Sequence, residues 1–211
     1  MTIRGFVTAI GAALIALSTA PAPGVAAVAP HTEKAVLAGG CFWGMEGVFE
    51  SLSGVTNVVS GFAGGDAASA HYDQVSTGTT GHAESVEITY DPARITYHQL
   101  LEVFFLAAHD PTTRDRQGPD EGTQYRSAIF YASEEQKREA QSEIAALTRA
   151  HAFAAPIVTQ VVPLHGFYAA EAYHQHFMAL HPDYPYIVIN DKPKLGVLRT
   201  KFPQLVKKGS A

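Results

Sequence analysis

The chain contains a single cysteine, Cys41, and this count limits how the protein can be held together. One cysteine cannot form an internal disulfide, so a folded domain built from this sequence must be stabilised by the packing of apolar side chains. Hydrophobic residues make up 46% of the 211 residues, which is enough for a sizeable core. The thiol of Cys41 therefore stays available for chemistry.

The surroundings of Cys41 favour a reactive thiol. The cysteine lies in the segment Gly39-Gly40-Cys41-Phe42-Trp43-Gly44. A turn of small residues leads into the thiol, two large aromatic residues follow it, and the pattern over residues 41–51 predicts a helix. This order gives the thiol an open approach, an apolar wall and the positive end of a helix dipole. A buried structural cysteine is the ordinary alternative.

Residues 1–29 have the layout of a secretory signal peptide. Arg4 is followed by an apolar run from Phe6 to Leu17 and then by small residues with Pro21 and Pro23. Cleavage is expected near residues 26–29, which predicts a protein exported to a bacterial periplasm or secreted. An uncleaved membrane anchor is the alternative, although the prolines cut the apolar run below the ~20 residues of a spanning helix. Residues 30–211 are predicted to form a single domain.

Strand and helix patterns interleave irregularly in this domain, which favours an α+β fold with two layers. Strands are predicted over residues 34–37, 55–62, 83–90, 128–131 and 158–162, and helices over 41–51, 96–105, 133–150 and 169–180. Thr96 with Gln99, and Ser133 with Gln136, resemble capping boxes at two helix starts. Residues 114–124 are interpreted as a loop, and the tail beyond Lys192 has too little pattern to assign.

Charge and histidine spacing argue against two classes of partner. The net charge of −5 gives no basic footprint, so nucleic acid is not expected to bind. His174 and His176 are two residues apart on a predicted helix and would point to different faces. Neither His-Glu-x-x-His nor paired-cysteine spacing is present, so no metal site is expected.

The segment around Cys41 resembles the signature of the A-type peptide methionine sulfoxide reductases, and further segments match that family in order. These are Gly61-Phe62-Ala63-Gly64-Gly65, Thr80-Gly81-His82-Ala83-Glu84, Tyr90-Asp91-Pro92, His109-Asp110-Pro111-Thr112, Arg116-Gln117-Gly118-Pro119-Asp120 and Gly122-Thr123-Gln124-Tyr125-Arg126-Ser127. Phe62 stands where the family has tyrosine. The resemblance covers about residues 35–184. It implies a single catalytic domain, a two-layer α/β sandwich with a ferredoxin-like mixed sheet and flanking helices, and no bound cofactor.

By this resemblance, Cys41 is the nucleophile that takes oxygen from methionine sulfoxide and becomes a sulfenic acid. Glu84 matches the acid that donates a proton to the sulfoxide oxygen, and Tyr72 and Tyr125 match hydroxyl donors that hold this oxygen. The implied activity is that of a peptide-methionine (S)-S-oxide reductase, acting on free or protein-bound methionine sulfoxide.

The resemblance also implies that Phe42 and Trp43 form the walls of the methyl pocket, and that Asp120 is an acidic residue of the site. From the residues alone, ordinary alternatives remain open. Trp43 and the two tyrosines can be core residues, and Asp120 can cap a loop. Glu84 lies one residue off the apolar face of its predicted strand, so it can be a solvated strand-edge acid.

Reference pKa values show that Cys41 would be mostly protonated at pH 7 without a stabilising neighbour. An unperturbed thiol is only ~3% thiolate at pH 7, and apolar walls with a nearby carboxylate oppose the thiolate further. An unperturbed glutamate is only ~0.2% protonated at that pH. We therefore hypothesise that burial raises the pKa of Glu84, so that it keeps a proton for the sulfoxide oxygen while Cys41 ionises.

The chain resembles the one-cysteine variety of the family, because Ser76 stands where some relatives have a further cysteine. Oxidised Cys41 must then be reduced by an external thiol, either a small thiol or a thioredoxin-like or glutaredoxin-like protein. Two other classes stay open. One is a hydrolase with Cys41 as acyl acceptor and His82 or His109 as base. The other is a binding protein lipidated on Cys41, which the distance from the apolar run disfavours.

Overall fold

The structure is a computed structural model that describes residues 31–209 together with residues 1, 2 and 5. The predicted signal peptide, residues 1–29, lies outside the described residues apart from those three positions. Within the described residues, no helix has the length and apolar character needed to cross a membrane.

The strands form one large sheet and one small sheet. They are β1 Glu33–Gly39, β2 Val55–Ala63, β3 Ala83–Tyr90, β4 Arg116–Gln117, β5 Asp120–Glu121, β6 Ser127–Tyr131, β7 Gln160–Pro163 and β8 Phe167–Ala169. The large sheet has the order β7-β6-β1-β3-β2-β8, and β4 pairs with β5. Only the β6–β7 pair of the large sheet is parallel. This mixed sheet confirms the predicted α+β class.

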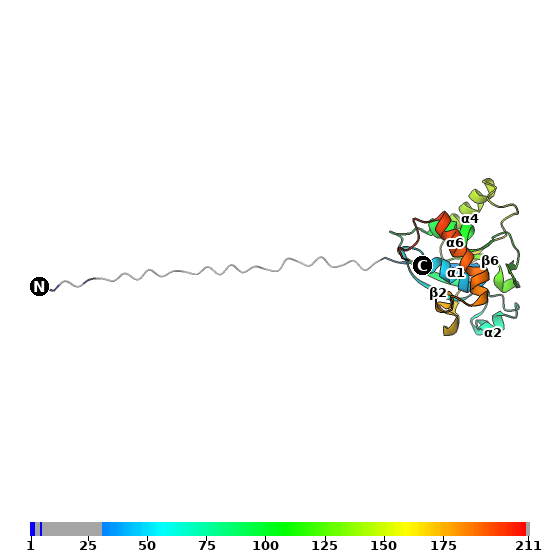
Figure 1. Cartoon of the computed structure of the whole chain (residues 1–211), viewed down its shortest axis with the longest axis horizontal. Helices are drawn as coiled ribbons and strands as arrows, with labels where there is room; N and C mark the ends of the chain where they lie inside the picture. Colours follow the sequence, from blue (N-terminus) through cyan, green and yellow to red (C-terminus); the bar gives the residue numbers. More distant parts are fainter. Residues whose placement is uncertain (3–4, 6–30, 210–211) are drawn as a thin grey trace.

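The helices and helical turns connect and cover these strands. They are α1 Phe42–Glu50, α2 Tyr72–Val75, α3 Tyr97–Val103, α4 Glu134–Arg149, α5 Phe177–Leu180 and α6 Lys192–Lys201, with the short turns η1 Ala67–Ser69, η2 Phe104–Ala108, η3 Thr123–Tyr125, η4 Ala172–His174 and η5 Ile187–Asp191. Helix α1 packs on β1, β2 and β3, and it also contacts α5 and α6. Figure 1 shows α1 in the middle of the domain, with α4 and α2 toward opposite ends.

The core lies between α1 and the sheet. Successive residues of a strand point to opposite faces, so Leu37 of β1 and Val86 of β3 join Phe49 of α1 in the main apolar cluster. Val36 and Phe130 belong to a smaller cluster of buried residues on the other side. Helix α1 therefore has one side fixed in the core, and Cys41 precedes its first residue.

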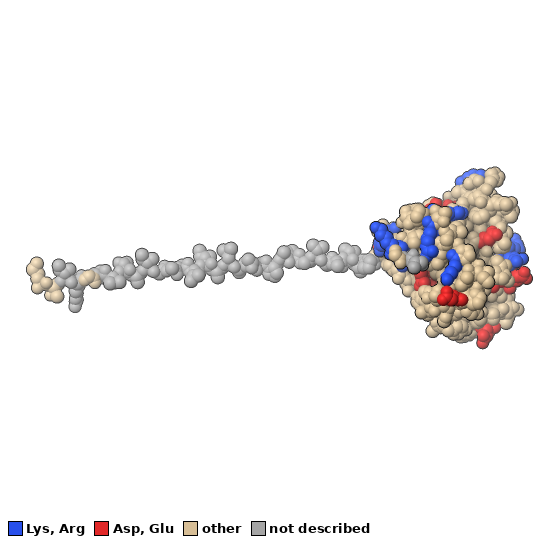
Figure 2. All heavy atoms as spheres, in the orientation of Figure 1, with Lys and Arg blue, Asp and Glu red and all other residues tan. Residues whose placement is uncertain are grey.

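Charged side chains of both signs share the face shown in Figure 2. Among the ion pairs of the described residues, Lys34 Nζ lies 2.7 Å from Glu87 Oε1, and the lysine is exposed. Exposed pairs of this kind stabilise a protein by only about 0–1 kcal/mol. The apolar core is therefore the main source of stability, as the single cysteine required.

Several predicted elements are confirmed. Strand β3 has the predicted bounds, and α1 begins within one residue of its prediction. Thr96 and Gln99 form both bonds of a capping box. The Ser133 side chain also caps its helix, but Gln136 accepts from the backbone of Ala132 in place of completing the box.

Other predictions were wrong at the C-terminal side. Residues 169–180 are not one helix, because the chain there forms the end of β8, then η4 and then α5. The side chain of Gln175 binds both backbone groups of Ser60, which holds this segment in a non-helical path. The predicted loop 114–124 contains β4, β5 and the start of η3, and the unassigned tail forms α6.

Candidate active site

The turn before α1 fixes the position of Cys41. Gly40 has φ +89°, a conformation that favours glycine, and a Cβ added there would lie 2.5 Å from the side chain of Gln117. The chain then enters α1 with Cys41 as the N-cap residue, and Cys41 is only 8% exposed. The sequence therefore places the thiol at the junction of a central strand and the core helix.

The electrostatic surroundings of Cys41 oppose its ionisation. Burial raises the pKa of the Cys41 thiol well above its usual value, and the negative charges of Glu84 and Asp191 raise it further. The backbone N–H of Trp43 and the ammonium of Lys194 act in the opposite direction. This direction agrees with the expectation that the resting thiol is not strongly ionised.

Glu84 lies beside the Cys41 turn because β1 and β3 are antiparallel with Leu37 opposite Val86. Its side chain is 2% exposed, and its Oε2 accepts a hydrogen bond from the Phe42 N–H at 3.1 Å. Burial raises its pKa to about 8, although the Phe42 N–H lowers it. Glu84 shares the apolar face with Val86, so the sequence-based placement beside that face was wrong.

Two predicted tyrosines face the same centre from different elements. Tyr72 begins α2 and Tyr125 ends η3. Burial raises the pKa of Tyr72 to about 12, with Glu84 and Cys41 adding to the effect. Burial also raises the pKa of Tyr125, followed by the charge of Glu84. Both rings are partly buried, so they border the site while remaining in contact with solvent.

Asp120 reaches the centre from β5 and is linked to Tyr186. The Tyr186 hydroxyl donates a hydrogen bond to Asp120 Oδ2. Burial raises the pKa of Asp120, while this bond and the charge of Lys194 lower it. Burial and the neighbouring Cys41 raise the pKa of the Tyr186 hydroxyl, so it remains a donor. Tyr186 is thus a third hydroxyl at the site.

The two aromatic residues after Cys41 form a wall with later parts of the chain. The ring of Trp43 stacks on Phe177 with centroids 3.8 Å apart, and its Nε1–H donates to His174 Nδ1 at 3.2 Å. Phe42 is 1% exposed, and its ring centroid lies 4.9 Å from that of His174. The predicted residues Phe42 and Trp43 therefore lie beside the thiol, with Trp43 the more accessible.

The structure brings all seven predicted residues together, and it adds others that the sequence interpretation missed. The additional residues are His174, Phe177, Tyr186, Asp191 and Lys194. They lie within residues 174–194, where the secondary structure was misassigned or not assigned. A helix-start signal was present there, since Asp191 is the N-cap of α6 and Pro193 lies in its first turn.

Neither histidine named for the hydrolase alternative is free to act as a base. His82 receives the Gly65 N–H on Nδ1, and its Nε2 lies 3.0 Å from the Asp66 carbonyl oxygen. Both ring nitrogens of His109 are likewise engaged, with the Phe104 carbonyl and the Ser127 hydroxyl. Burial lowers the pKa of His109 to about 4. Lipidation at Cys41 would require cleavage after β1, a central strand of the sheet.

His174 and His176 were expected on two faces of one helix, but that helix does not form, and the two residues have separate partners. The His176 N–H donates to Glu46 Oε2 at 2.8 Å, and His176 Nδ1 lies 2.6 Å from Glu50 Oε1. Glu50 raises the pKa of His176. One ligand atom from each of these three residues lies within 4.8 Å of the other two. The direct bonds from His176 to Glu46 and Glu50 explain why these three residues lie together: they hold the segment before α5 against α1.

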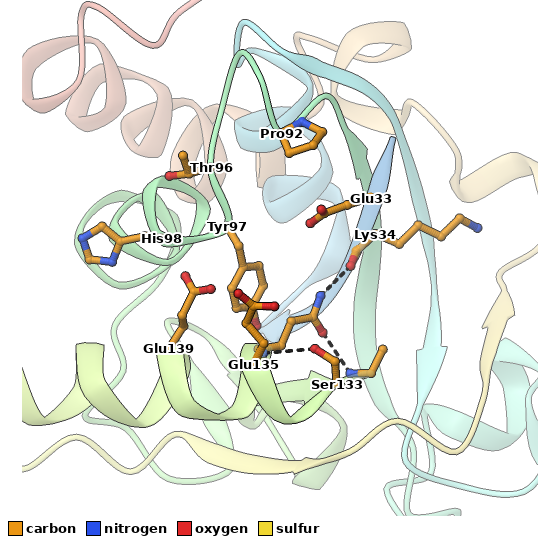
Figure 3. A pocket seen from close by; sticks show the side chains of 11 residues that line it. Glu33, Lys34, Pro92, Thr96, Tyr97, His98, Ser133, Glu135 and Glu139 are labelled. Atoms are coloured by element: carbon orange, nitrogen blue, oxygen red, sulfur yellow. Dashed lines mark hydrogen bonds between the residues drawn. The ribbon is translucent and has the colours of Figure 1, made fainter. Parts of the chain in front are cut away.

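A large cavity lies at the other end of β1 from Cys41. It has a volume of about 630 Å³ and is lined by residues that include Glu33, Tyr97 and Glu139 (Figure 3). Glu33 begins β1 and Gly39 ends it, so the length of a seven-residue strand, about 20 Å, separates this cavity from the thiol turn. We place the chemistry at Cys41, because the reactive groups converge there.

Comparison with known proteins identifies the family of this chain. A family model described as peptide methionine sulfoxide reductase matches residues 33–205. Peptide methionine sulfoxide reductase MsrA 2 of Mesorhizobium japonicum is 55% identical over 177 residues, which cover 84% of this chain and 91% of that protein. MsrA of Thermus thermophilus is 49% identical over 175 residues, with 83% and 98% covered.

Solved structures show the same relationship. The reduced form of Mxr1 from Saccharomyces cerevisiae matches with a TM-score of 0.68 and 33% identity, covering 72% of this chain and 87% of that one. Methionine sulfoxide reductase A of Corynebacterium diphtheriae matches with a TM-score of 0.64 and 37% identity, covering 73% and 77%. The family match spans every residue gathered around Cys41.

Proposed function

Because this chain belongs to the peptide methionine sulfoxide reductase A family, whose members are oxidoreductases that reduce methionine sulfoxide, we propose that Cys41 carries out this reduction as the nucleophile. The chain covers most of the length of its relatives, so the activity is that of the whole domain. The observation that carries the proposal is the buried Glu84 carboxyl bonded to the backbone beside the only cysteine.

The first step transfers oxygen from substrate to enzyme. Glu84, with a pKa of about 8, is about 90% protonated at pH 7 and gives its proton to the sulfoxide oxygen. Cys41 attacks the electron-poor sulfur, the substrate S–O bond breaks, and the oxygen ends on Cys41 as a sulfenic acid. The substrate sulfur gains two electrons and the Cys41 sulfur loses two, while the thiol proton returns to Glu84.

The remaining site residues bind and orient the substrate. The hydroxyls of Tyr72 and Tyr125 donate to the departing oxygen, and their raised pKa values keep them protonated. Asp120 orients the Tyr186 hydroxyl through their hydrogen bond. Phe42 and Trp43 seat the methyl group. This arrangement receives the S epimer of methionine sulfoxide, free or in proteins, since each type of reductase serves one epimer.

A second step must restore the thiol with help from outside. The chain offers no other cysteine, so two external thiols reduce the sulfenic acid to Cys41, water and a disulfide. A thioredoxin-like or glutaredoxin-like protein, or a small dithiol, supplies them. No bound cofactor and no nucleic acid take part. Comparing these donors at equal thiol concentration identifies the preferred one by its kcat/KM.

The location is proposed from the sequence. The apolar N-terminal segment directs export to a bacterial periplasm or to the medium, and cleavage near residues 26–29 leaves a protein without stable membrane association. Mass spectrometry of the protein from fractionated cells gives the mature N-terminus. A chain that keeps Met1 in the membrane fraction contradicts this location and supports an uncleaved anchor.

The test of the function is a stereospecific single turnover. Wild-type protein without reductant, mixed with each epimer separately, is expected to release one mole of methionine per mole of protein from the S epimer. Cys41 should then carry one added oxygen by mass analysis. Cys41→Ser is the control and should keep the circular dichroism spectrum but release no methionine. Turnover by Cys41→Ser would exclude the proposed nucleophile.

A further inference from the structure

A buried ion pair lies against the first turn of α1, the helix that follows Cys41. Asp191 is 0% exposed, and the Lys194 side chain is 17% exposed. Lys194 Nζ donates to Asp191 Oδ1 at 2.9 Å, and Asp191 Oδ2 has no hydrogen-bond partner in the described residues. A carboxylate with one unpartnered oxygen is costly to bury, so this pair needs an explanation beyond packing.

The ion pair lies beside Gly44, a residue of the first turn of α1. A Cβ added at Gly44 would lie 2.7 Å from Lys194 Nζ and would collide with the Asp191 carboxyl. Glycine at this position therefore lets both charges approach the start of α1, where Cys41 is the N-cap.

Most groups around the thiol disfavour its negative form. The titratable and charged groups that surround it are Glu84 of β3, Tyr72 of α2, Tyr125 of η3, Asp120 of β5, His109 after η2, His174 of η4, Tyr186 before η5, Asp191 of η5 and Lys194 of α6. The acids are negative when ionised, and the His109 and His174 rings are buried and neutral because burial lowers the pKa of each. Lys194 is the cation that opposes them at Cys41.

We propose that Lys194 is a positioning residue for the proposed reaction, the cation that makes the Cys41 thiol ionise more readily, and that Asp191 holds its ammonium against the first turn of α1. The inference rests on the proposed role of Cys41 as nucleophile. Lys194 would then be a second residue, besides Glu84, that affects ionisation of this thiol. It belongs to α6, which carries none of the site residues predicted from the sequence.

The test measures the ionisation of Cys41 without turnover. The rate of alkylation by iodoacetamide, a neutral reagent, is followed against pH in the full-length protein. The decisive comparison is Lys194→Met against Lys194→Arg, with Asp191 left in place because it holds the cation. Lys194→Met should alkylate roughly three- to tenfold more slowly than wild type at pH 7, since the cation is removed and the neighbouring anions remain. Lys194→Arg keeps the positive charge and should alkylate at the wild-type rate.

Lys201→Met is the matched control. Lys201 lies on the same helix, but its Nζ donates to the Leu106 carbonyl oxygen, so no change in the alkylation profile is expected. Equal profiles for Lys194→Met and wild type would overturn the inference. If Lys194→Met does not fold, Lys194→Gln takes its place against Lys194→Arg, and equal profiles again overturn it.

These outcomes are separable from failure of the proposed function. The alkylation profiles depend only on the thiol and its neighbours. A protein that shows the expected profiles but reduces neither epimer would contradict the proposed function and support the role of Lys194. If the wild type reduces the S epimer normally but the alkylation profiles of the Lys194 variants equal that of the wild type, the proposed function is supported and the role of Lys194 is contradicted.

Discussion

The Glu84 carboxyl accepts a hydrogen bond from the backbone N–H of Phe42, the residue that directly follows Cys41. This 3.1 Å bond joins the acid on β3 to the first residue of α1, so the distance between acid and thiol is set by two core elements. Because the acceptor is one carboxyl oxygen, a glutamine at position 84 can still accept the bond while lacking the acidic proton.

Glu84→Gln is therefore expected to keep the fold and lose the proton donor. General acid catalysis contributes about 10²–10⁴-fold, so kcat for the S epimer should fall by about 10² or more. In the wild type, Glu84 with a pKa of about 8 is protonated below that pH, so activity should decline as the pH rises through 8. The kcat–pH profile of both proteins checks this, and full activity in Glu84→Gln would remove its role as acid.

Local signals predicted the centre of the site well. The glycine turn and aromatic pair place Cys41 at a helix start, and the alternation of residues 83–90 predicts β3 with its bounds. The Thr96 side chain caps α3 because its hydroxyl accepts from the Gln99 N–H three residues later. Each of these features depends on neighbours within a few positions, which a single sequence displays.

The rest depended on partners far away in the chain. Strand β8 forms because Ala169 pairs with Gly61, and the sequence around Ala169 does not indicate that partner. Gln175 replaces helical bonds with bonds to Ser60, which is a tertiary effect that outweighs helix propensity. Tyr186 joins the site only because the chain returns to Asp120, so its role was invisible in its own neighbourhood.

Stability is expected to fall between pH 6.5 and 8.5. Burial raises the folded-state pKa of Glu84 to about 8 and that of Glu46 to about 7. A carboxyl with a raised pKa binds its proton more tightly in the folded state, so its contribution is lost as the pH rises through that value. Each group should cost on the order of 1 kcal/mol across this window, or a few degrees of melting temperature.

Thermal melting of wild type and Glu46→Gln at closely spaced pH values measures this dependence. Glu46→Gln should flatten the curve, because glutamine still accepts the His176 N–H but does not titrate. Glu135→Gln, at an exposed position of α4, is the control and should leave the curve unchanged. A wild-type melting temperature that stays constant or rises over this window would contradict burial of the two acids.

Trp43→Ala is expected to weaken substrate binding more than it slows the chemical step. The indole stacks on Phe177 and forms an accessible part of the apolar wall, without a proton to give to the sulfoxide oxygen. Loss of a pocket wall should raise KM roughly tenfold, with a smaller change in kcat. Trp43→Phe keeps an aromatic ring and should stay near wild type. Steady-state kinetics with a short oxidised peptide decide, and an unchanged KM in Trp43→Ala would remove it from the pocket.

Gly40→Ala is expected to damage both stability and activity. Gly40 has φ +89°, and its new Cβ would lie 2.5 Å from Gln117, whose side chain is held by two bonds to the backbone of Asp110. The left-handed backbone alone costs about 1–2 kcal/mol for a non-glycine residue.

Gly118→Ala is a matched control, since Gly118 has φ +56° with nothing within 4 Å. Urea unfolding should therefore show a larger loss for Gly40→Ala, and only this variant should lower the single-turnover rate, because the turn sets the position of Cys41. Equal losses in the two variants would mean that the contact with Gln117 relaxes without cost.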